Sequence, residues 1–167
     1  MKKLTLIRHA KSDWDHPSLS DHERPLNKRG KRAAPAVGRE LARREVKPDL
    51  ILSSTAVRAL TTAQAIAAEI GYPVERIVQE EAVYLASVAE LERVVAAIDD
   101  SGGIGHVMVF GHNPGMEDFL AHLSGGYADQ RFITCAVAEL DLDIDHWGEV
   151  TAGCGSLRSF FTPHDLA

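Results

Sequence analysis

Arginines and histidines recur at the ends of β-rich runs in this 167-residue sequence. Arg8 and His9 come directly after the first such run. Arg58 follows the second run, and His112 follows the fourth. In open parallel sheets, loops from separate strands meet outside the carboxyl ends of the strands, where ligands bind. We therefore expect these four side chains to share one site.

These residue types suit phosphoryl transfer. The transition state of that reaction spreads negative charge over several oxygens, and positioned positive groups stabilise it. An arginine fork can hold two oxygens. Arg58 and His112 both lie at or beside the expected start of a helix, where backbone N–H groups favour an anion. The sequence therefore predicts a phosphate-binding site.

No pattern indicates a metal ion or another cofactor. HExxH, CxxC and GxxxxGK[ST] are missing, and Asp118 with His122, one helical turn apart, is more simply a solvated pair. A reaction without a metal needs a side-chain nucleophile. Imidazole serves when its attacking nitrogen is unprotonated and a carbonyl holds the other nitrogen. Nearby arginines would lower the pKa of His9.

Short β-rich runs alternate with longer helical patterns, which is typical of an α/β fold with a mostly parallel sheet. Strands are predicted over residues 4–8, 50–53, 76–78 and 106–110. Helices are predicted over residues 28–45, 56–70, 87–98 and 114–123. Residues 11–26 show no periodicity and are expected to form a loop. Residues 135–142 and 147–152 are expected to pair as antiparallel strands.

Local signals mark the helix ends. Asn27 is expected to cap the first helix. Ser54 or Thr55 is expected to cap the second, which Gly71 ends. Pro35 either kinks the first helix or marks its true first turn, and the sequence leaves both open.

The composition is that of a single globular domain spanning residues 1–167. The 45% hydrophobic and 25% charged fractions are ordinary for a chain long enough to bury a core. Cys135 and Cys154 are too few for a disulfide framework, so we expect two buried free thiols and a reducing compartment. The apolar run 4–7 is too short for a signal peptide, and no stretch is long enough to span a membrane. We expect a cytoplasmic protein without a membrane partner.

The charge is distributed unevenly. Residues 24–47 hold 9 of the 18 Lys and Arg but only two Glu, so this segment carries +7 within a chain of net charge −6. A solvated helix face is the simpler explanation. The segment could also steer an acidic or phosphorylated partner. Nucleic acid is not an expected partner, because the chain is acidic and no aromatic residues are interleaved with these cations.

Five motifs carry a resemblance that covers nearly the whole chain. They are Arg8-His9-Ala10-Lys11-Ser12, Arg24-Pro25-Leu26 with Gly30, Leu52-Ser53 through Arg58-Ala59 to Thr62-Ala63, Gly111-His112-Asn113-Pro114, and Gly155-Ser156-Leu157 with Pro163. Together they resemble the histidine phosphatase superfamily, most closely its short phosphohistidine phosphatase (SixA-like) branch. Ala10 departs from the better-known superfamily pattern, which has glycine there. Its methyl group is expected beside the phosphate pocket, without loss of activity.

The resemblance implies a three-layer α/β fold, with a mostly parallel mixed sheet of about six strands and helices on both faces. It also implies that His9 is the phosphorylated nucleophile. Arg8, Arg58 and His112 would bind the phosphoryl oxygens. Arg24 is a further candidate from the loop.

The resemblance also suggests an acid–base residue. Glu81 matches the carboxylate that protonates the leaving oxygen in relatives that cleave phosphate esters, and Glu80 has a nearly equal claim. A phosphoramidate needs this acid less because its P–N bond is labile. Glu81 would then matter more as the base that activates water against phospho-His9. Lys11 is most simply explained as a solvated surface side chain without a role in the reaction.

The expected function is that of a metal-independent phosphatase that acts on phosphohistidine of a protein. The short chain lacks the long insertions that enclose a sugar phosphate in larger relatives, so we expect an open site. A small-molecule phosphomonoesterase or mutase of the same superfamily is an alternative, although a mutase needs a closed site. A non-catalytic phosphate-binding module is a third, which predicts loss of His9 or Glu81, and both are present.

Overall fold

The computed structural model describes residues 1–126 and 130–166, and it is built around one mixed sheet. The strand order is β3-β2-β4-β1-β5-β6. The strands are β1 (Lys2–Arg8), β2 (Leu50–Ser53), β3 (Val78–Gln79), β4 (His106–Gly111), β5 (Val137–Leu142) and β6 (Gly155–Phe161). Neighbours among β1 to β4 pair in parallel, whereas β5 pairs antiparallel with β1 and β6.

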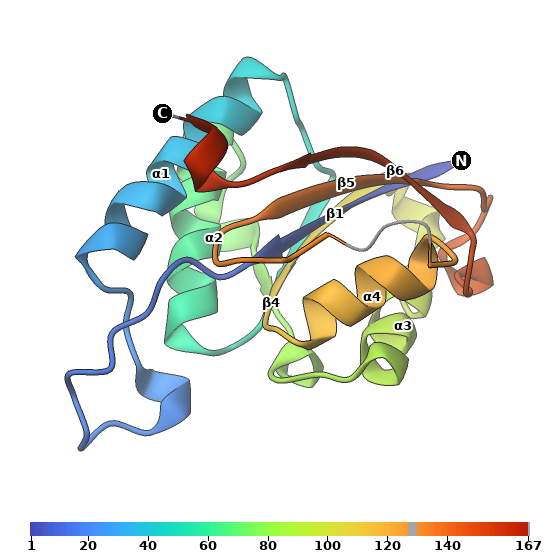
Figure 1. Cartoon of the computed structure of the whole chain (residues 1–167). Coiled ribbons are helices and arrows are strands. Elements are labelled where there is room, and N and C mark those ends of the chain that lie inside the picture. The colour runs from blue at the N-terminus through green and yellow to red at the C-terminus, as the bar shows by residue number, and fades with distance from the viewer. Residues whose placement is uncertain (127–129, 167) are drawn as a thin grey trace.

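Helices cover both faces of the sheet. They are α1 (Lys28–Arg43), α2 (Val57–Ile70), α3 (Val88–Ala96) and α4 (Gly115–Leu123). Figure 1 shows α1 and α2 on one face and α3 and α4 on the other. Successive side chains of a strand point to opposite faces. Accordingly, Leu4 and Leu6 pack in the core under α3 and α4, and Ile7 packs in the core under α1 and α2. The predicted three-layer α/β fold is confirmed.

The start of α1 is fixed beside the loop that follows β1. Asn27 caps the helix, and its side chain accepts a hydrogen bond from the backbone N–H of Gly30 at 2.8 Å. A Cβ at Gly30 would lie 2.2 Å from the carbonyl oxygen of Lys11, so only glycine allows this approach. Pro35 lies inside α1 and not in its first turn. The basic end of α1 is therefore held against the loop that carries His9.

The last strand lies later in the sequence than predicted. The strand expected at 147–152 is wrong, because Trp147–Glu149 form a 3-10 turn and β6 supplies the partner of β5. Trp147 is fully buried, and its indole N–H donates to the carbonyl oxygen of Ile104 at 2.8 Å. An aromatic residue close to valine suggested a strand, but here its side chain fills the core from a connection.

The second helix begins without a side-chain cap. Ala56 occupies the N-cap position, so the expectation that Ser54 or Thr55 caps α2 is wrong. The Oγ of Ser54 accepts a hydrogen bond from the N–H of Ala56 at 3.2 Å and lies 2.7 Å from Nε2 of His112. The Oγ1 of Thr55 lies 2.8 Å from Nε2 of His22. Both hydroxyls serve the loops at the carboxyl edge of the sheet instead of the helix end.

The other predicted elements lie within two residues of their observed bounds. Both cysteines are free thiols, Cys135 buried and Cys154 half-buried. Within residues 1–126 and 130–166, no helix is long and apolar enough to cross a membrane.

Candidate active site

The carboxyl end of the parallel strands carries an open pocket of about 580 Å³. Arg8 and His9 reach it from the end of β1, and His112 reaches it from the end of β4. Arg58 reaches it from the first turn of α2, and Arg24 from the loop before α1. The structure thus brings together the four side chains that were expected to share a site, and it adds Arg24 to the same wall.

His9 is oriented by its own backbone. Its ring is buried, and Nδ1 lies 2.7 Å from the carbonyl oxygen of Ala10. A carbonyl only accepts hydrogen bonds, so Nδ1 carries the proton and Nε2 keeps its lone pair. The N–H of Ala10 donates to Oγ1 of Thr62 at 3.0 Å, which fixes this carbonyl in turn. The methyl group of Ala10 is fully buried in the core under α1 and α2 and does not line the pocket, contrary to expectation.

The surroundings of His9 keep it neutral. Burial lowers its pKa to about 4 against the opposing effect of the Ala10 hydrogen bond, and the positive charges of Arg58, Arg8 and Arg24 lower it further. The sequence indicated the arginines as the cause, but burial is the larger one. At neutral pH the ring therefore has an unprotonated nitrogen.

His112 stands beside His9 as a second neutral imidazole. The two ring centroids are 5.2 Å apart. Burial, with further effects of His9 and Arg58, lowers the pKa of His112 to about 3. Its Nε2 lies 2.7 Å from Oγ of Ser54, and its Nδ1 is buried without a hydrogen bond to any described residue. When Ser54 donates to Nε2, the proton of the ring is on Nδ1 and is free for an oxygen of a substrate.

Arg8 and Arg58 are each held at one end of the guanidinium. The Nη1 of Arg8 donates to the carbonyl oxygen of Phe132 at 3.2 Å, and Nη1 of Arg58 donates to that of Asp21 at 2.7 Å. The Nε atoms of both arginines are buried and have no hydrogen bond within residues 1–126 and 130–166. Buried donors without a partner are costly. Oxygens of a bound phosphoryl group would satisfy them.

Asp21 organises the arginines, although no sequence pattern indicated this role. Its carboxylate accepts hydrogen bonds from Nε and Nη2 of Arg24 at 3.2 and 3.0 Å, and from Nη2 of Arg58 at 3.0 Å. The hydroxyl of Tyr84 donates to the same carboxylate at 2.5 Å. Although burial opposes it, hydrogen bonds from Tyr84, Arg24 and Arg58 hold the pKa of Asp21 well below its usual range.

Arg24 is a buried part of the pocket wall. Its Nη1 donates to Oγ of Ser12 at 2.6 Å, and its guanidinium carbon lies 3.5 Å from the centre of the Trp14 ring. Together with the Asp21 contacts, these interactions fix its plane and restrict its motion. The resemblance made Arg24 a candidate phosphate-binding residue from the loop, and the structure places it in the pocket lining.

The two candidate acid–base residues lie apart from this pocket wall. Glu81 begins the 3-10 turn that follows β3, and its side chain is exposed. Glu80 accepts a hydrogen bond from the N–H of Ala82 at 3.4 Å. The carboxylates that do line the pocket are those of Asp13 and Asp15. The structure does not bring Glu81 to the pocket lining, and its role stays a prediction.

No group of three or more His, Cys, Asp or Glu side chains suited to a metal ion occurs within the described residues. Lys11 lines the pocket at its edge. Beside the two carboxylates, the pocket lining holds guanidinium, imidazole and ammonium groups, which suit a phosphoryl group.

Comparisons with known proteins show what this chain is similar to in sequence and fold. A family model described as histidine phosphatase superfamily (branch 1) matches residues 4–82. An uncharacterised chloroplastic protein of Arabidopsis thaliana is 33% identical over 161 residues, which cover 92% of this chain and 72% of that protein. A putative phosphohistidine phosphatase SixA from Agrobacterium tumefaciens is 30% identical, with a TM-score of 0.80 over 97% of this chain and 98% of that one. The structure of the protein histidine phosphatase SixA complexed with tungstate has a TM-score of 0.84 at 22% identity, covers 99% of both chains and supports the fold.

Proposed function

This chain belongs to the histidine phosphatase superfamily and is a phosphatase, and we propose that it removes the phosphoryl group from a phosphohistidine side chain of a protein. In this proposal Nε2 of His9 is the nucleophile. Arg8, Arg58 and His112 bind the phosphoryl oxygens, and Arg24 supports them from the loop before α1. The reaction needs no metal ion.

One observation carries the proposal. The hydrogen bond from Nδ1 of His9 to the carbonyl oxygen of Ala10 directs the lone pair of Nε2 away from its own backbone. The lowered pKa keeps this lone pair available at neutral pH. A nucleophile held in this way beside two arginines with unpartnered Nε–H groups is suited to attack phosphorus.

The first step transfers the phosphoryl group between two imidazoles. Nε2 of His9 forms a bond to phosphorus as the P–N bond to the substrate imidazole breaks, and the leaving nitrogen takes up a proton from solvent water. Because the bond formed and the bond broken are of the same kind, this step is nearly thermoneutral. The guanidinium groups of Arg8 and Arg58 and the ring of His112 stabilise the charge on the equatorial oxygens.

The second step releases inorganic phosphate. Water forms an O–P bond with phospho-His9 as the P–Nε2 bond breaks, and the electron pair of that bond returns to the imidazole. We assign removal of the water proton to Glu81, which lies at the carboxyl edge of the sheet in the turn after β3. Because the Glu81 side chain is exposed and lies outside the pocket lining, it has to turn toward phospho-His9 to reach the attacking water.

The rim of the pocket favours a protein substrate. Trp14 is 74% exposed and Leu85 is 56% exposed, and both line the pocket. Exposed apolar side chains around a polar site are typical of surfaces that contact another protein. A small phosphorylated metabolite would contact only the buried arginines and histidines of the pocket and not these exposed apolar side chains.

A turnover comparison tests the proposed substrate. The enzyme is given a phosphohistidine protein, phosphoramidate, a sugar phosphate and an aryl phosphate, and we expect the highest kcat/KM for the phosphohistidine protein. A higher value for the sugar phosphate would favour the small-molecule phosphomonoesterase. Binding of phosphate without turnover of any compound would make the chain a binding module.

The nucleophile is tested by rapid quench. Wild-type enzyme is expected to give an acid-labile phosphoenzyme, and His9→Ala is expected to give none and to lose at least about 10³-fold in kcat. His146→Ala is the control, because that side chain is exposed and remote from the pocket lining. Retained turnover in His9→Ala would show that the nucleophile is another residue.

A further inference from the structure

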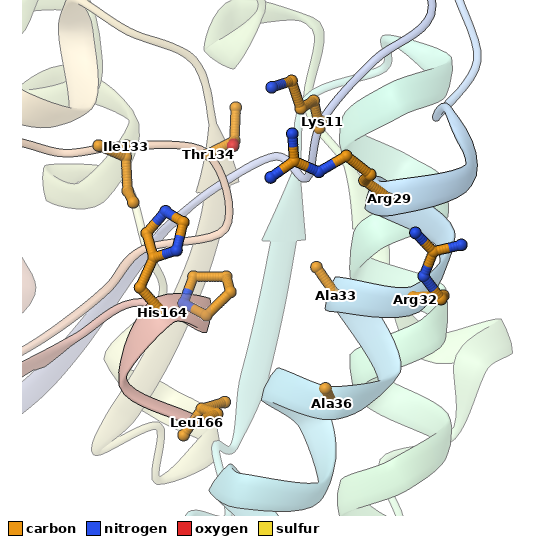
Figure 2. A pocket seen from close by; sticks show the side chains of 10 residues that line it. Lys11, Arg29, Arg32, Ala33, Ala36, Ile133, Thr134, His164 and Leu166 are labelled. Atoms are coloured by element: carbon orange, nitrogen blue, oxygen red, sulfur yellow. The ribbon is translucent and has the colours of Figure 1, made fainter.

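A second pocket adjoins the active-site pocket. It has a volume of about 490 Å³ and shares Lys11 and Thr134 with the active-site pocket. Its other walls come from the first turns of α1, from the connection before β5 and from residues 163–166. Figure 2 shows these three segments around the pocket. A molecule with its phosphoryl group at His9 can therefore extend into this second pocket.

The second pocket carries cations that no carboxylate of the described residues pairs with. Lys11, Arg29 and Arg32 line it, and its lining includes no carboxylate. Among the contacts of residues 1–126 and 130–166, the side chains of these three residues form no ion pair or hydrogen bond. In Figure 2, the guanidinium of Arg29 extends across the helix end toward the side of the pocket where Lys11 and Thr134 lie. Such a cluster attracts an external anion.

The other end of α1 is different. Arg39 pairs with Glu69 at 3.7 Å, and Glu40 pairs with Arg43 at 2.5 Å and with Arg44 at 2.7 Å. Within α1 the cations are thus paired where the helix is remote from the active site. The cations of α1 that form no ion pair among the described residues lie in the turns nearest the active site. Lys47, past the end of the helix, is also unpaired among the described residues.

Apart from Thr134 and the imidazole of His164, the rest of the second pocket is apolar. Ala33 and Ala36 line it from α1, Ile133 lines it from the opposite side, and Pro163 and Leu166 line it from the C-terminal turn. An apolar floor beside a cationic edge fits a carboxylate next to an aliphatic side chain. It does not fit a compact polar ion, which would leave the apolar floor unused.

We propose that this pocket binds an acidic segment of the phosphorylated protein, so that a carboxylate near the phosphohistidine contacts Lys11 and Arg29 and an apolar side chain lies on Ala33. The inference rests on the proposed function. It defines the substrate class further, as proteins whose phosphohistidine is flanked by acidic and apolar residues. Charge attraction outside the catalytic groups would lower KM without changing kcat.

The test uses two synthetic phosphohistidine peptides that differ only in flanking residues, Glu in one and Gln in the other, together with phosphoramidate. The variant is the double substitution Arg29→Glu with Arg32→Glu. Lys31→Glu is the matched control, because it reverses a charge on the same exposed turn of α1 but does not line the pocket. Thermal unfolding of each variant verifies that the fold is retained.

We expect wild-type enzyme to prefer the Glu peptide by about tenfold in KM, and the double variant to lose this preference. Its kcat and its turnover of phosphoramidate should match those of the wild type, and Lys31→Glu should keep most of the preference. Arg29→Lys should also keep it, since the charge remains.

Two results would overturn the inference while leaving the proposed function intact. One is equal KM for both peptides in the wild type. The other is a loss in Lys31→Glu that equals, per reversed charge, the loss in the double variant, which would indicate a general field effect. Absence of turnover on both peptides, with retained turnover on an aryl phosphate, would instead contradict the proposed function.

Discussion

The floor of the active-site pocket, formed by Arg8, His9, Arg58 and His112, differs from its exposed rim, formed by Trp14 and Leu85, in how tightly its side chains are held. At the floor, Arg58 is 3% exposed and His9 is 7% exposed, and each donates to a backbone carbonyl. At the rim, Trp14 and Leu85 are mostly exposed, and Glu81 lies in solvent. The fold therefore fixes the groups suited to chemistry before a substrate arrives. It leaves the groups suited to selection free to adapt to a partner.

Asp21 connects the two regions. It lies in the loop before α1, with its side chain 43% exposed, yet its carboxylate holds the buried Arg58 and Arg24. Tyr84 joins from the turn after β3, and its ring lies edge-on to that of His112 with 5.4 Å between centroids. Substitution of Asp21 or Tyr84 should therefore alter the positions of the buried Arg24 and Arg58 side chains.

The strongest way to separate the two regions is to remove a floor cation. Arg58→Ala is expected to reduce kcat by about 10²- to 10³-fold on every substrate, because it deletes charge that is aimed at the phosphoryl oxygens. Arg58→Lys should recover only part of the lost kcat, since an ammonium group cannot bind two phosphoryl oxygens with parallel N–H donors. Leu85→Ala, at the rim, should instead raise KM for a protein substrate alone. Steady-state kinetics on a phosphohistidine protein and on phosphoramidate measure both, and substrate-selective loss in Arg58→Ala would contradict the comparison.

Low pH should lower both the activity of the enzyme and its free energy of unfolding, because buried histidines become protonated. Protonation of His9 removes its lone pair, so kcat/KM is expected to stay level from neutral pH to about pH 5 and to fall about tenfold per unit below its pKa of about 4. The folded-state pKa values of His9, His106 and His112 lie below the ordinary value of 6.5. The unfolded chain therefore binds more protons between pH 6.5 and about 4, and the free energy of unfolding should decrease as pH falls through that window.

Kinetic pH profiles and urea unfolding at several pH values measure the two effects separately. His106→Gln is the control, because His106 lies at the opposite edge of the sheet, 2.8 Å from Oγ1 of Thr5. It should flatten the pH dependence of stability and leave the activity profile unchanged. A kinetic transition near pH 6.5 would show that His9 titrates as an ordinary histidine.

A smaller effect on kcat is expected from substitution of Asp21, which connects the rim to the buried arginines. Asp21→Asn removes the negative charge that holds Arg24 and Arg58, and we expect about a tenfold decrease in kcat with little change in KM. A double-mutant cycle with Tyr84→Phe should show coupling, since both side chains position the same guanidinium groups. Glu23→Gln is the matched control, because among the described residues that exposed carboxylate accepts hydrogen bonds only from Ser20 in its own turn. Additive effects in the cycle would indicate independent roles.

The smallest effect on a phosphoramidate is expected at Glu81. Glu81→Gln should slow hydrolysis of the phosphoenzyme by about tenfold, and should leave its formation from phosphoramidate unchanged because the P–N bond needs no strong acid. Glu80→Gln should match the wild type in both steps. Single-turnover quench experiments separate formation from hydrolysis. If Glu80→Gln is slow and Glu81→Gln is not, the acid–base assignment is wrong.

The sequence by itself determined the fold class and the grouping of four side chains. Arg8, His9, Arg58 and His112 each follow a strand, and parallel strands joined by helices place such positions at one edge of the sheet. This is a consequence of chain topology, so it needs no knowledge of side-chain contacts. The same local signals placed most helices and strands within two residues of their bounds.

Only the tertiary structure decided how these side chains are held. Asp21 and Arg58 are 37 residues apart, and Ser54 and His112 are 58 apart, so no local pattern reveals either contact. The burial of Trp147 against Ile104, which displaced a predicted strand, is of the same kind. A side chain's partners depend on which distant segments pack beside it, whereas its position at a strand end depends on its neighbours in the chain. The sequence thus locates the site, and packing sets its protonation state and its orientation.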